Sequence, residues 1–278
     1  MADKGLNPDG TIAREGSLDR VTTAFAPVVA AARTEITGRF GDGRLGGGRP
    51  GGGRLHSAYL YGSIPRGTAV PGTSDLDLML VLHEEPAARD RADADAAEAA
   101  LDGSFDAIDG AGILLVDTRA ALSELERYDL GFFISCLCTP LLGDDLAARL
   151  PAQRPTSLLA RETNGDLELT LPRWREALRN AGTDAGRRTL CRRIARRVVR
   201  SGFTLVMPRW GGWTSDLHES AELFAGHYPQ RADQMRIAAA VARAPTSDPA
   251  VIRVLVEDLG PWLAAEYTAV HGRKAARP

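Results

Sequence analysis

The chain has 278 residues, of which 44% are hydrophobic and 25% are charged, with a formal net charge of -2. These values are typical of a soluble globular protein with one large or two ordinary domains. The balanced charge excludes a global attraction to nucleic acid or to an anionic membrane, so any phosphate binding must be local. Because the sequence has neither a visible signal peptide nor an apolar run that could span a bilayer, we expect a cytoplasmic protein.

The first elements expected along the chain are a loose tail, a helix and a linker. Residues 1–15 carry no clear pattern and are predicted to be the tail. Apolar residues recur at helical spacing over 17–40, with Ser17 as a candidate N-cap, and Pro27 either kinks this helix or marks its start. Glycine dominates residues 41–54, which predicts a flexible surface connection whose arginines could also touch RNA or a triphosphate.

Two apolar strands joined by a polar loop come next. The first, residues 58–61, stops at Gly62-Ser63, and the second begins at residue 74 and continues to residue 82. In an extended chain alternate side chains share a face, so Asp75 and Asp77 are expected to point the same way. Two neighbouring carboxylates repel each other unless a cation lies between them, and an all-oxygen pair suits Mg²⁺ bound to substrate phosphates.

This arrangement resembles the signature of the polymerase-β-like nucleotidyltransferase superfamily, particularly its small-molecule, aminoglycoside-type members. The matching residues are Gly62, Ser63, Asp75 and Asp77 on the strand, Gly-Ser, loop, Asp-x-Asp pattern, and Arg66 and Ser74 lie where many members carry similar residues. The resemblance implies that Asp75 and Asp77 hold two Mg²⁺ ions. It also implies that Gly62, Ser63, Arg66 and Ser74 contact the nucleotide. The alternative from the residues alone is a hairpin with two solvated aspartates.

The resemblance also calls for a third acid on a neighbouring strand, which would complete the metal site and accept a proton. The run 112–116 is the expected strand, after a charged helix predicted over 84–101. Asp106, Asp109 and Asp117 are the candidates, and Asp109 is chosen because of its distance from the pair. A Gly-Ala-Gly break separates Asp109 from the strand, which departs from the family pattern.

A domain boundary is predicted at the Pro-bearing run 151–157, giving a nucleotidyltransferase domain over 1–150 and a helical domain over 151–278. Seven arginines accompany a narrow apolar stripe after residue 186. They form either a solvated face paired with acids or a group that reaches the triphosphate, and Arg192 and Arg196 are the preferred nucleotide contacts. Cys136 and Cys138, in the apolar run 132–142, are expected to be buried and unreactive.

An aromatic corner follows the arginine helix, with two tryptophans around Gly-Gly and then Thr-Ser-Asp. Thr214 or Ser215 is expected to cap the next helix. By resemblance to aminoglycoside nucleotidyltransferases, Trp213 and Asp216 are also candidates for the wall of an acceptor pocket.

The expected fold class is therefore α/β (α+β), with a small mixed sheet followed by an α-helical bundle. The resemblance implies an Mg²⁺-dependent enzyme that transfers a nucleoside monophosphate, with AMP expected, from ATP or another NTP and releases pyrophosphate. The expected acceptor is a hydroxyl of a small molecule such as an aminoglycoside-like antibiotic, which would make antibiotic resistance the biological role. Transfer to RNA or to a protein, of the toxin–antitoxin or AMPylation type, is an alternative. A non-catalytic nucleotide-binding module is another, and a missing third carboxylate would favour it.

Overall fold

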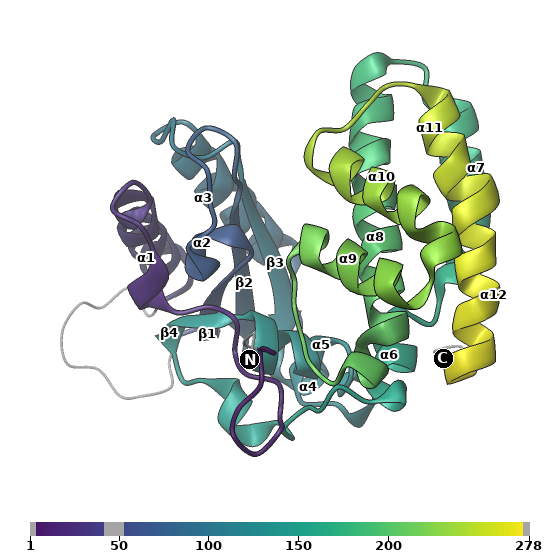
Figure 1. The fold of residues 1–278 in the computed structure, drawn as a ribbon. Coiled ribbons are helices and arrows are strands. Elements are labelled where there is room, and N and C mark those ends of the chain that lie inside the picture. The colour runs from purple at the N-terminus through teal and green to yellow at the C-terminus, as the bar shows by residue number, and fades with distance from the viewer. Residues whose placement is uncertain (1–3, 42–52, 275–278) are drawn as a thin grey trace. The chain divides into compact units, whose positions relative to one another are not determined.

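The computed structural model describes residues 4–41 and 53–274, which form two compact units. One unit comprises residues 13–153, and the other combines residues 4–12 with residues 154–274. Figure 1 shows a sheet in the first unit and a helical bundle in the second. The division into folding domains at 1–150 and 151–278 stays a prediction, and the glycine-rich segment 42–52 lies outside the described residues.

The first unit is built on a four-stranded mixed sheet with the order β3-β2-β1-β4. Strand β1 is antiparallel to both β2 and β4, whereas β2 and β3 are parallel. The strands are β1 (Leu55–Tyr61), β2 (Leu76–Leu82), β3 (Ala111–Asp117) and β4 (Thr139–Gly143). This sheet and the bundle that follows it confirm the predicted fold class.

Alternation along β2 separates two apolar clusters, one on each face of the sheet. Leu76, Leu78 and Leu80 pack with residues of α1 (Ala26–Phe40) and α3 (Ala88–Asp102). Met79 and Val81 pack on the opposite face, with Tyr59 of β1 and residues beyond β3. Because side chains alternate with a period of two, Asp77 belongs to the same face as Met79.

Short helical segments complete this unit beside α1, whose start is one of the two alternatives predicted for Pro27. Helix α1 begins at Ala26, so Pro27 marks its start rather than a kink. After β3 the chain forms two separate short turns, because the side chains of Asp117 and Ser123 each accept a backbone N–H and begin a turn of their own. The segments are η1 (Leu18–Arg20), α2 (Ser63–Arg66), α4 (Thr118–Ala121), η2 (Glu124–Glu126), α5 (Leu130–Phe132), η3 (Phe133–Leu137) and η4 (Leu146–Arg149).

The second unit is a bundle around α8 (Asp184–Trp210), a helix of 27 residues. Helices α9 and α10 pack against its middle, where Gly202 lies directly beneath Met235 and Phe224. The remaining elements are α6 (Ser157–Asn164), α7 (Leu167–Asn180), α9 (Leu217–His227), η5 (Pro229–Arg231), α10 (Ala232–Arg243), α11 (Pro249–Arg253), η6 (Val254–Leu259) and α12 (Gly260–His271).

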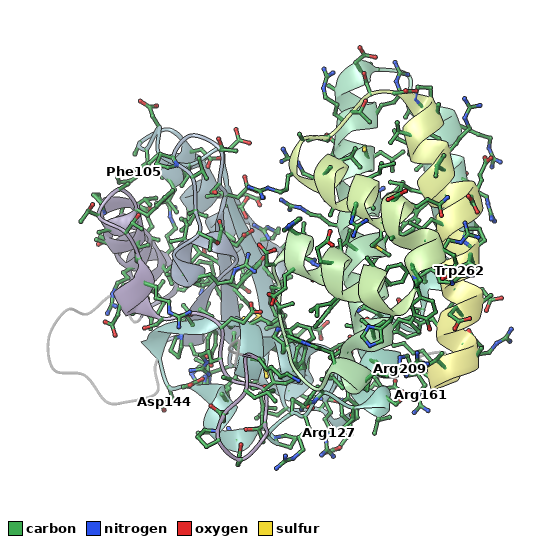
Figure 2. The ribbon with its side chains drawn as sticks, viewed as in Figure 1. Phe105, Arg127, Asp144, Arg161, Arg209 and Trp262 are labelled. Carbon is green, nitrogen blue, oxygen red and sulfur yellow. The ribbon has the colours of Figure 1, made fainter. Side chains whose placement is uncertain are left out.

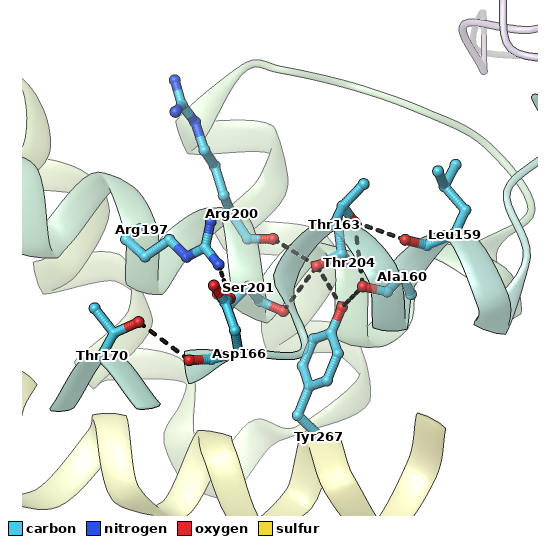
Figure 3. A network of polar contacts seen from close by, with 10 residues as sticks. All are labelled: Leu159, Ala160, Thr163, Asp166, Thr170, Arg197, Arg200, Ser201, Thr204 and Tyr267. Carbon is cyan, nitrogen blue, oxygen red and sulfur yellow. Dashed lines mark hydrogen bonds and ion pairs between the residues drawn. The ribbon is translucent and has the colours of Figure 1, made fainter. Parts of the chain in front are cut away.

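A buried polar network joins α6, α8 and α12 (Figure 3). The Tyr267 hydroxyl donates to the Ala160 carbonyl oxygen at 2.6 Å and lies 2.9 Å from Thr204 Oγ1. At the edge of the same region Arg197 forms an ion pair with Asp166. Burial raises the pKa of Tyr267, so this hydroxyl stays protonated as a donor inside the bundle.

Residues 4–12 pack with the bundle, which corrects the prediction of a loose tail for this part of residues 1–15. The Asn7 N–H donates to the Thr11 carbonyl at 2.8 Å, and Leu6 and Ile12 form an isolated bridge. The Lys4 carbonyl accepts the Trp213 N–H at 2.8 Å. The contact between Lys4 and Trp213 joins residues far apart in the chain and leaves no periodic pattern in the sequence, so pattern reasoning missed it.

Candidate functional site

The turn after β1 places a glycine against a carboxylate. Gly62 has a φ of +81°, a backbone conformation that L side chains rarely adopt. A Cβ at this position would overlap Asp77 Oδ2 and lie 3.3 Å from Asp77 Cγ. Both the backbone conformation and the close approach therefore require glycine here.

Strand pairing brings the two aspartates of the motif to the end of β2 beside this turn. Asp77 pairs with Tyr61 across the β1–β2 ladder, one residue before Gly62. Asp75 precedes β2 by one residue, so alternation places it on the same face as Asp77. Burial, with the negative charge of Asp77 as a second cause, raises the pKa of Tyr61. The Gly-Ser turn and the aspartate pair thus meet at one edge of the sheet.

The donor set at this edge fits a magnesium ion. Mg²⁺ uses one or two protein carboxylates and completes its octahedron with water and substrate phosphates. Asp75 and Asp77 supply two such carboxylates, and Gly62 leaves the adjacent backbone open to close approach. Within residues 4–41 and 53–274, no three His, Cys, Asp or Glu side chains come together as a metal-binding group.

The three candidate third acids lie at different places around β3. Asp117 is paired with Leu82 at the far end of the strand, five residues beyond the level of Asp77, or about 17 Å along it. Its Oδ1 accepts the Ala120 N–H at 2.8 Å and thereby caps α4. Asp109 precedes β3, and its backbone N–H donates to Ser74 O at 3.1 Å.

The β3 residue level with Asp77 is Gly112. The parallel register pairs Asp77 with Gly112, and the next β3 residue on the same face, Leu114, is exposed. A Cβ at Gly112 would meet no atom within 4 Å. The register therefore places an open, apolar stretch of β3 beside Asp77. The Gly-Ala-Gly break was the only sequence signal of this feature, and Asp106 lies further back in the preceding loop.

Ser74 and Arg66 hold the loop that joins β1 to β2. Ser74 Oγ accepts the Val70 N–H at 2.9 Å. Arg66 Nε donates to the Gly62 carbonyl oxygen at 2.9 Å, and its Nη1 lies 3.7 Å from Glu15 Oε2. Both side chains are thus part of the structure of the turn that surrounds Gly62.

The predicted site residues of the helical unit have varied surroundings. Arg196 is exposed and Arg192 half-buried on α8. Trp213 is buried, with its ring edge-on to Phe203 at 5.5 Å between centroids. Asp216 is the N-cap of α9, because its Oδ1 accepts the Glu219 N–H at 2.8 Å.

The residue that caps α9 is therefore Asp216, rather than Thr214 or Ser215 as predicted. Thr214 still takes part, because its hydroxyl donates to Glu219 Oε2 at 2.6 Å and accepts the Asp216 N–H at 3.2 Å. The three side chains of Thr214, Asp216 and Glu219 thus form one closed set of bonds at this helix start.

The cysteines are unsuited to nucleophilic chemistry, as their sequence context predicted. Burial raises the pKa of Cys136 to about 11 and that of Cys138 well above its usual value. Since the thiolate is the nucleophile, both side chains stay protonated and inert near neutral pH. Cys191 is also buried, and its pKa is raised by burial as well.

None of the helices among the described residues is both long and apolar enough to cross a lipid bilayer. No protein-family model matches the sequence, and no curated protein sequence matches it. Among solved structures, this chain is similar to a spectinomycin adenyltransferase from Enterococcus faecialis, crystallised with ATP and spectinomycin. The TM-score is 0.47 and the sequence identity 13%, over 88% of this chain and 98% of that one.

Proposed function

We propose that this chain is a nucleotidyltransferase that moves a nucleoside monophosphate from an Mg²⁺-bound triphosphate to an acceptor. The observation that carries the proposal is the contact between Gly62, at a φ of +81°, and the carboxylate of Asp77. Gly62 also turns the chain from the end of β1 into α2, and its lack of a side chain keeps the backbone beside Asp77 uncovered. It leaves room for phosphate oxygens close to the backbone and next to a metal-binding group.

The residues of this edge would share the work of holding the triphosphate. Asp75 and Asp77 would bind the cation, and backbone N–H groups around Gly62 and Ser63 would bind phosphate oxygens. When bound, Mg²⁺ would offset the negative charge of the phosphates and stabilise charge on the leaving pyrophosphate. Arg66 and Ser74 would contribute by fixing the turn, in keeping with their bonds to Gly62 O and Val70 N.

In the finer form of the proposal, ATP is the donor, two Mg²⁺ ions act, and the acceptor is a small hydroxylated molecule such as an aminoglycoside-like antibiotic. Asp109 would then be the third acid, and Arg192 and Arg196 would contact the triphosphate. Trp213 and Asp216 would line the acceptor pocket. Their packing and capping contacts mean that any such role would come in addition to a structural one.

A second candidate is a nucleotide-binding module without transfer chemistry. The open position at Gly112 favours it, because β3 offers no carboxylate on the Asp77 face at the level of that residue. A hydroxyl acceptor needs a group that accepts its proton, and such a base contributes about 10²–10⁴-fold to a rate. In this candidate Mg²⁺ and ATP would bind, but no pyrophosphate would leave.

The test incubates the full chain with each labelled NTP, Mg²⁺ and a panel of aminoglycosides, other small hydroxylated compounds and tRNA. Pyrophosphate release is followed together with nucleotide binding by calorimetry. We expect Mg²⁺-dependent release with at least one acceptor. Binding without release under every condition would reject transfer and support the binding module, and the absence of both would reject the nucleotide site itself.

The matched variants are Asp77→Asn and Asp144→Asn, which each remove one carboxylate charge. Asp144 is an exposed residue directly after β4 (Figure 2). We expect Asp77→Asn to lose more than the 10–100-fold that loss of an outer partner typically costs a metal site, and Asp144→Asn to stay near the parent. Circular dichroism checks that both variants remain folded, and equal activity in the two variants would contradict the proposal.

A further inference from the structure

The near-neutral charge of the whole chain conceals opposite charges on its two units. Residues 13–153 contain 13 Lys and Arg against 21 Asp and Glu, a net charge of -8. Residues 1–12 and 154–278 contain 21 Lys and Arg against 15 Asp and Glu, a net charge of +6. The overall value of -2 therefore says nothing about polyanion binding by the helical unit, which is basic by itself.

Much of this positive charge lies along one side of α8, in a group that we name the arginine stripe. Three of its members recur at four-residue spacing, so they follow one face of the helix at intervals of about 6 Å. The members are Arg188, Arg192, Arg193 and Arg196. Arg192 is half-buried and the other three are exposed. The stripe spans about 12 Å of the outer surface of the helix.

The arginines of the stripe form no ion pair with any residue in the described parts of the chain, whereas their neighbours on α8 do. Arg187 is paired with Asp184 at 2.6 Å, and Arg197 is paired with Asp166. Figure 3 shows Arg197 turned towards Asp166. Like charges at four-residue spacing destabilise a helix by a few tenths of a kcal/mol for each pair, and the charge of Asp184 offsets part of this cost only at Arg188, the first member of the stripe.

Other acids of the helical unit are already engaged with arginines outside the stripe. Glu222 binds Arg236 through two bonds of 2.8 Å, and Asp258 accepts from Arg231 at 2.9 Å. Arg173, Arg175, Arg179, Arg243 and Arg253 are also exposed without an ion pair in the described parts of the chain. The stripe differs from them because three of its members follow one face of a single helix at four-residue spacing. A solvated face that served only solubility would not need four guanidinium groups of one sign in two helical turns.

The shape of this surface favours a chain of phosphates over a small ligand. Small molecules bind in concave pockets, and the side of a single helix is convex. A polynucleotide strand can instead lie along such a surface and offer one phosphate after another to forked arginine donors. No aromatic residue lies on the exposed positions of α8 between residues 188 and 196, so bases would not be stacked or read there.

We propose that the arginine stripe binds the phosphodiester backbone of a single-stranded nucleic acid, without sequence preference. This inference goes beyond the proposed function, because it requires neither Mg²⁺ nor nucleotidyl transfer. It gives Arg192 and Arg196 a ligand other than the triphosphate named for them in the finer form of that function. A nucleic-acid strand bound to α8 would serve either as the acceptor of the transferred nucleoside monophosphate or as a scaffold that holds the protein. The only chemical feature that the stripe requires of its ligand is a run of closely spaced phosphates.

The experiment measures fluorescence anisotropy of labelled oligouridine and oligothymidine with the full chain, at several salt concentrations and without Mg²⁺ or NTP. Each phosphate contact in a single strand adds about 0.7 to the slope of log affinity against log salt, so four contacts predict a slope near -3. Tighter binding of the uridine or of the thymidine strand identifies RNA or DNA as the natural source. Either result supports the proposal, and the absence of binding to both strands overturns it.

Two double variants test the location of the binding surface. Arg192→Gln with Arg196→Gln removes two charges from the stripe, and we expect the slope to fall by about 1.4 and the affinity about 25-fold at 0.1 M salt. Arg209→Gln with Arg273→Gln removes two charges from the same unit, at the last turn of α8 and beyond α12, and should change affinity little. Equal weakening by both doubles would overturn the proposal.

A competition experiment distinguishes the binding of a nucleic-acid strand from the binding of a single nucleotide. ATP should displace the oligonucleotide only weakly, whereas inorganic polyphosphate should displace it well. If ATP binds as tightly as the oligonucleotide and displaces it fully, the stripe contacts a triphosphate, and the strand proposal fails. Asp77→Asn should keep full oligonucleotide binding, so a failure of the proposed transfer reaction leaves this test unaffected.

Discussion

The turn at Gly62 and the corner at Trp213 both stand out in the sequence, but their residues are used differently. At Trp213–Asp216 the aromatic ring is buried against Phe203 and the carboxylate caps a helix, so each feature has a purpose in folding. At Gly62 a rare backbone conformation brings a backbone turn against the Asp77 carboxylate. The comparison teaches that a backbone position next to a carboxylate that only glycine can occupy is a better sign of a site than unusual residue types.

The largest expected effect on stability lies at the corner. Trp213→Ala should lower the free energy of unfolding by about 3–5 kcal/mol, the usual cost of truncating a buried aromatic residue. Trp213 is 9% exposed as a residue, and the contact of its ring with Phe203 would be lost. Urea denaturation measures the change. Trp213→Phe is the matched control, since it keeps an aromatic ring at the site, and a similar loss in both variants would argue against packing as the cause.

Gly62→Ala should cost less stability than Trp213→Ala but far more function. A non-glycine residue in a sparsely populated conformation costs about 1–3 kcal/mol, and the added Cβ must also displace the Asp77 carboxylate. We therefore expect Mg²⁺-dependent nucleotide binding, followed by calorimetry, to fall below detection in a protein that still folds. Gly67→Ala is the control, because Gly67 also has a positive φ, +74°, but has Arg20 rather than Asp77 as its neighbour. Equal loss of binding in both variants would contradict a specific role for Gly62.

Local pattern predicted those parts of the fold that depend on local spacing. The strand ending at Tyr61 follows from alternation, and the same pattern predicts the second strand two residues too early, at 74 instead of Leu76. Ser17 is a cap as its chemistry predicts, but of the short turn η1 and not of α1, which begins at Ala26. The packing of residues 4–12 on the bundle could not be predicted in this way. It depends on contacts such as that between Lys4 O and Trp213 N, which join segments far apart in the chain.

Local pattern also predicted only part of the candidate site. Asp75 and Asp77 can be assigned to one face by extending the alternation of β2 to Asp75, the residue just before the strand. The neighbour of Asp77 on β3 depends instead on the parallel register, which pairs it with Gly112. Distance along the sequence favoured Asp109, whereas register is set by how the two strands meet in space.

Asp216→Ala should have a moderate effect. Loss of an N-cap side chain costs about 1 kcal/mol, here through the bond from Asp216 Oδ1 to the Glu219 N–H. Asp216→Asn keeps an accepting oxygen and should retain most of that stability, as thermal unfolding would reveal. If the residue also lines an acceptor pocket, both variants should lose affinity for the acceptor. If Asp216→Asn lowers the affinity for the acceptor without lowering stability, the corner serves the site as well as the fold, and the difference between the corner and the turn at Gly62 no longer holds.

The smallest expected effect on stability is at Gly112. Variants at this position test most directly whether the edge of the sheet at Asp77 carries out transfer chemistry. A side chain there meets open space and needs no unusual backbone, so Gly112→Ala should change the free energy of unfolding by no more than about 0.5 kcal/mol. Gly112→Glu should be equally well tolerated and would place a carboxylate on the face of β3 beside Asp77. If transfer to a hydroxyl is limited by the lack of a base, this variant should release pyrophosphate at least about tenfold faster than Gly112→Ala, a fraction of what general bases contribute. Equal rates in the two variants, measured with the acceptor that supports release, would mean that the proton leaves by another route and that the open position at Gly112 serves to admit the acceptor.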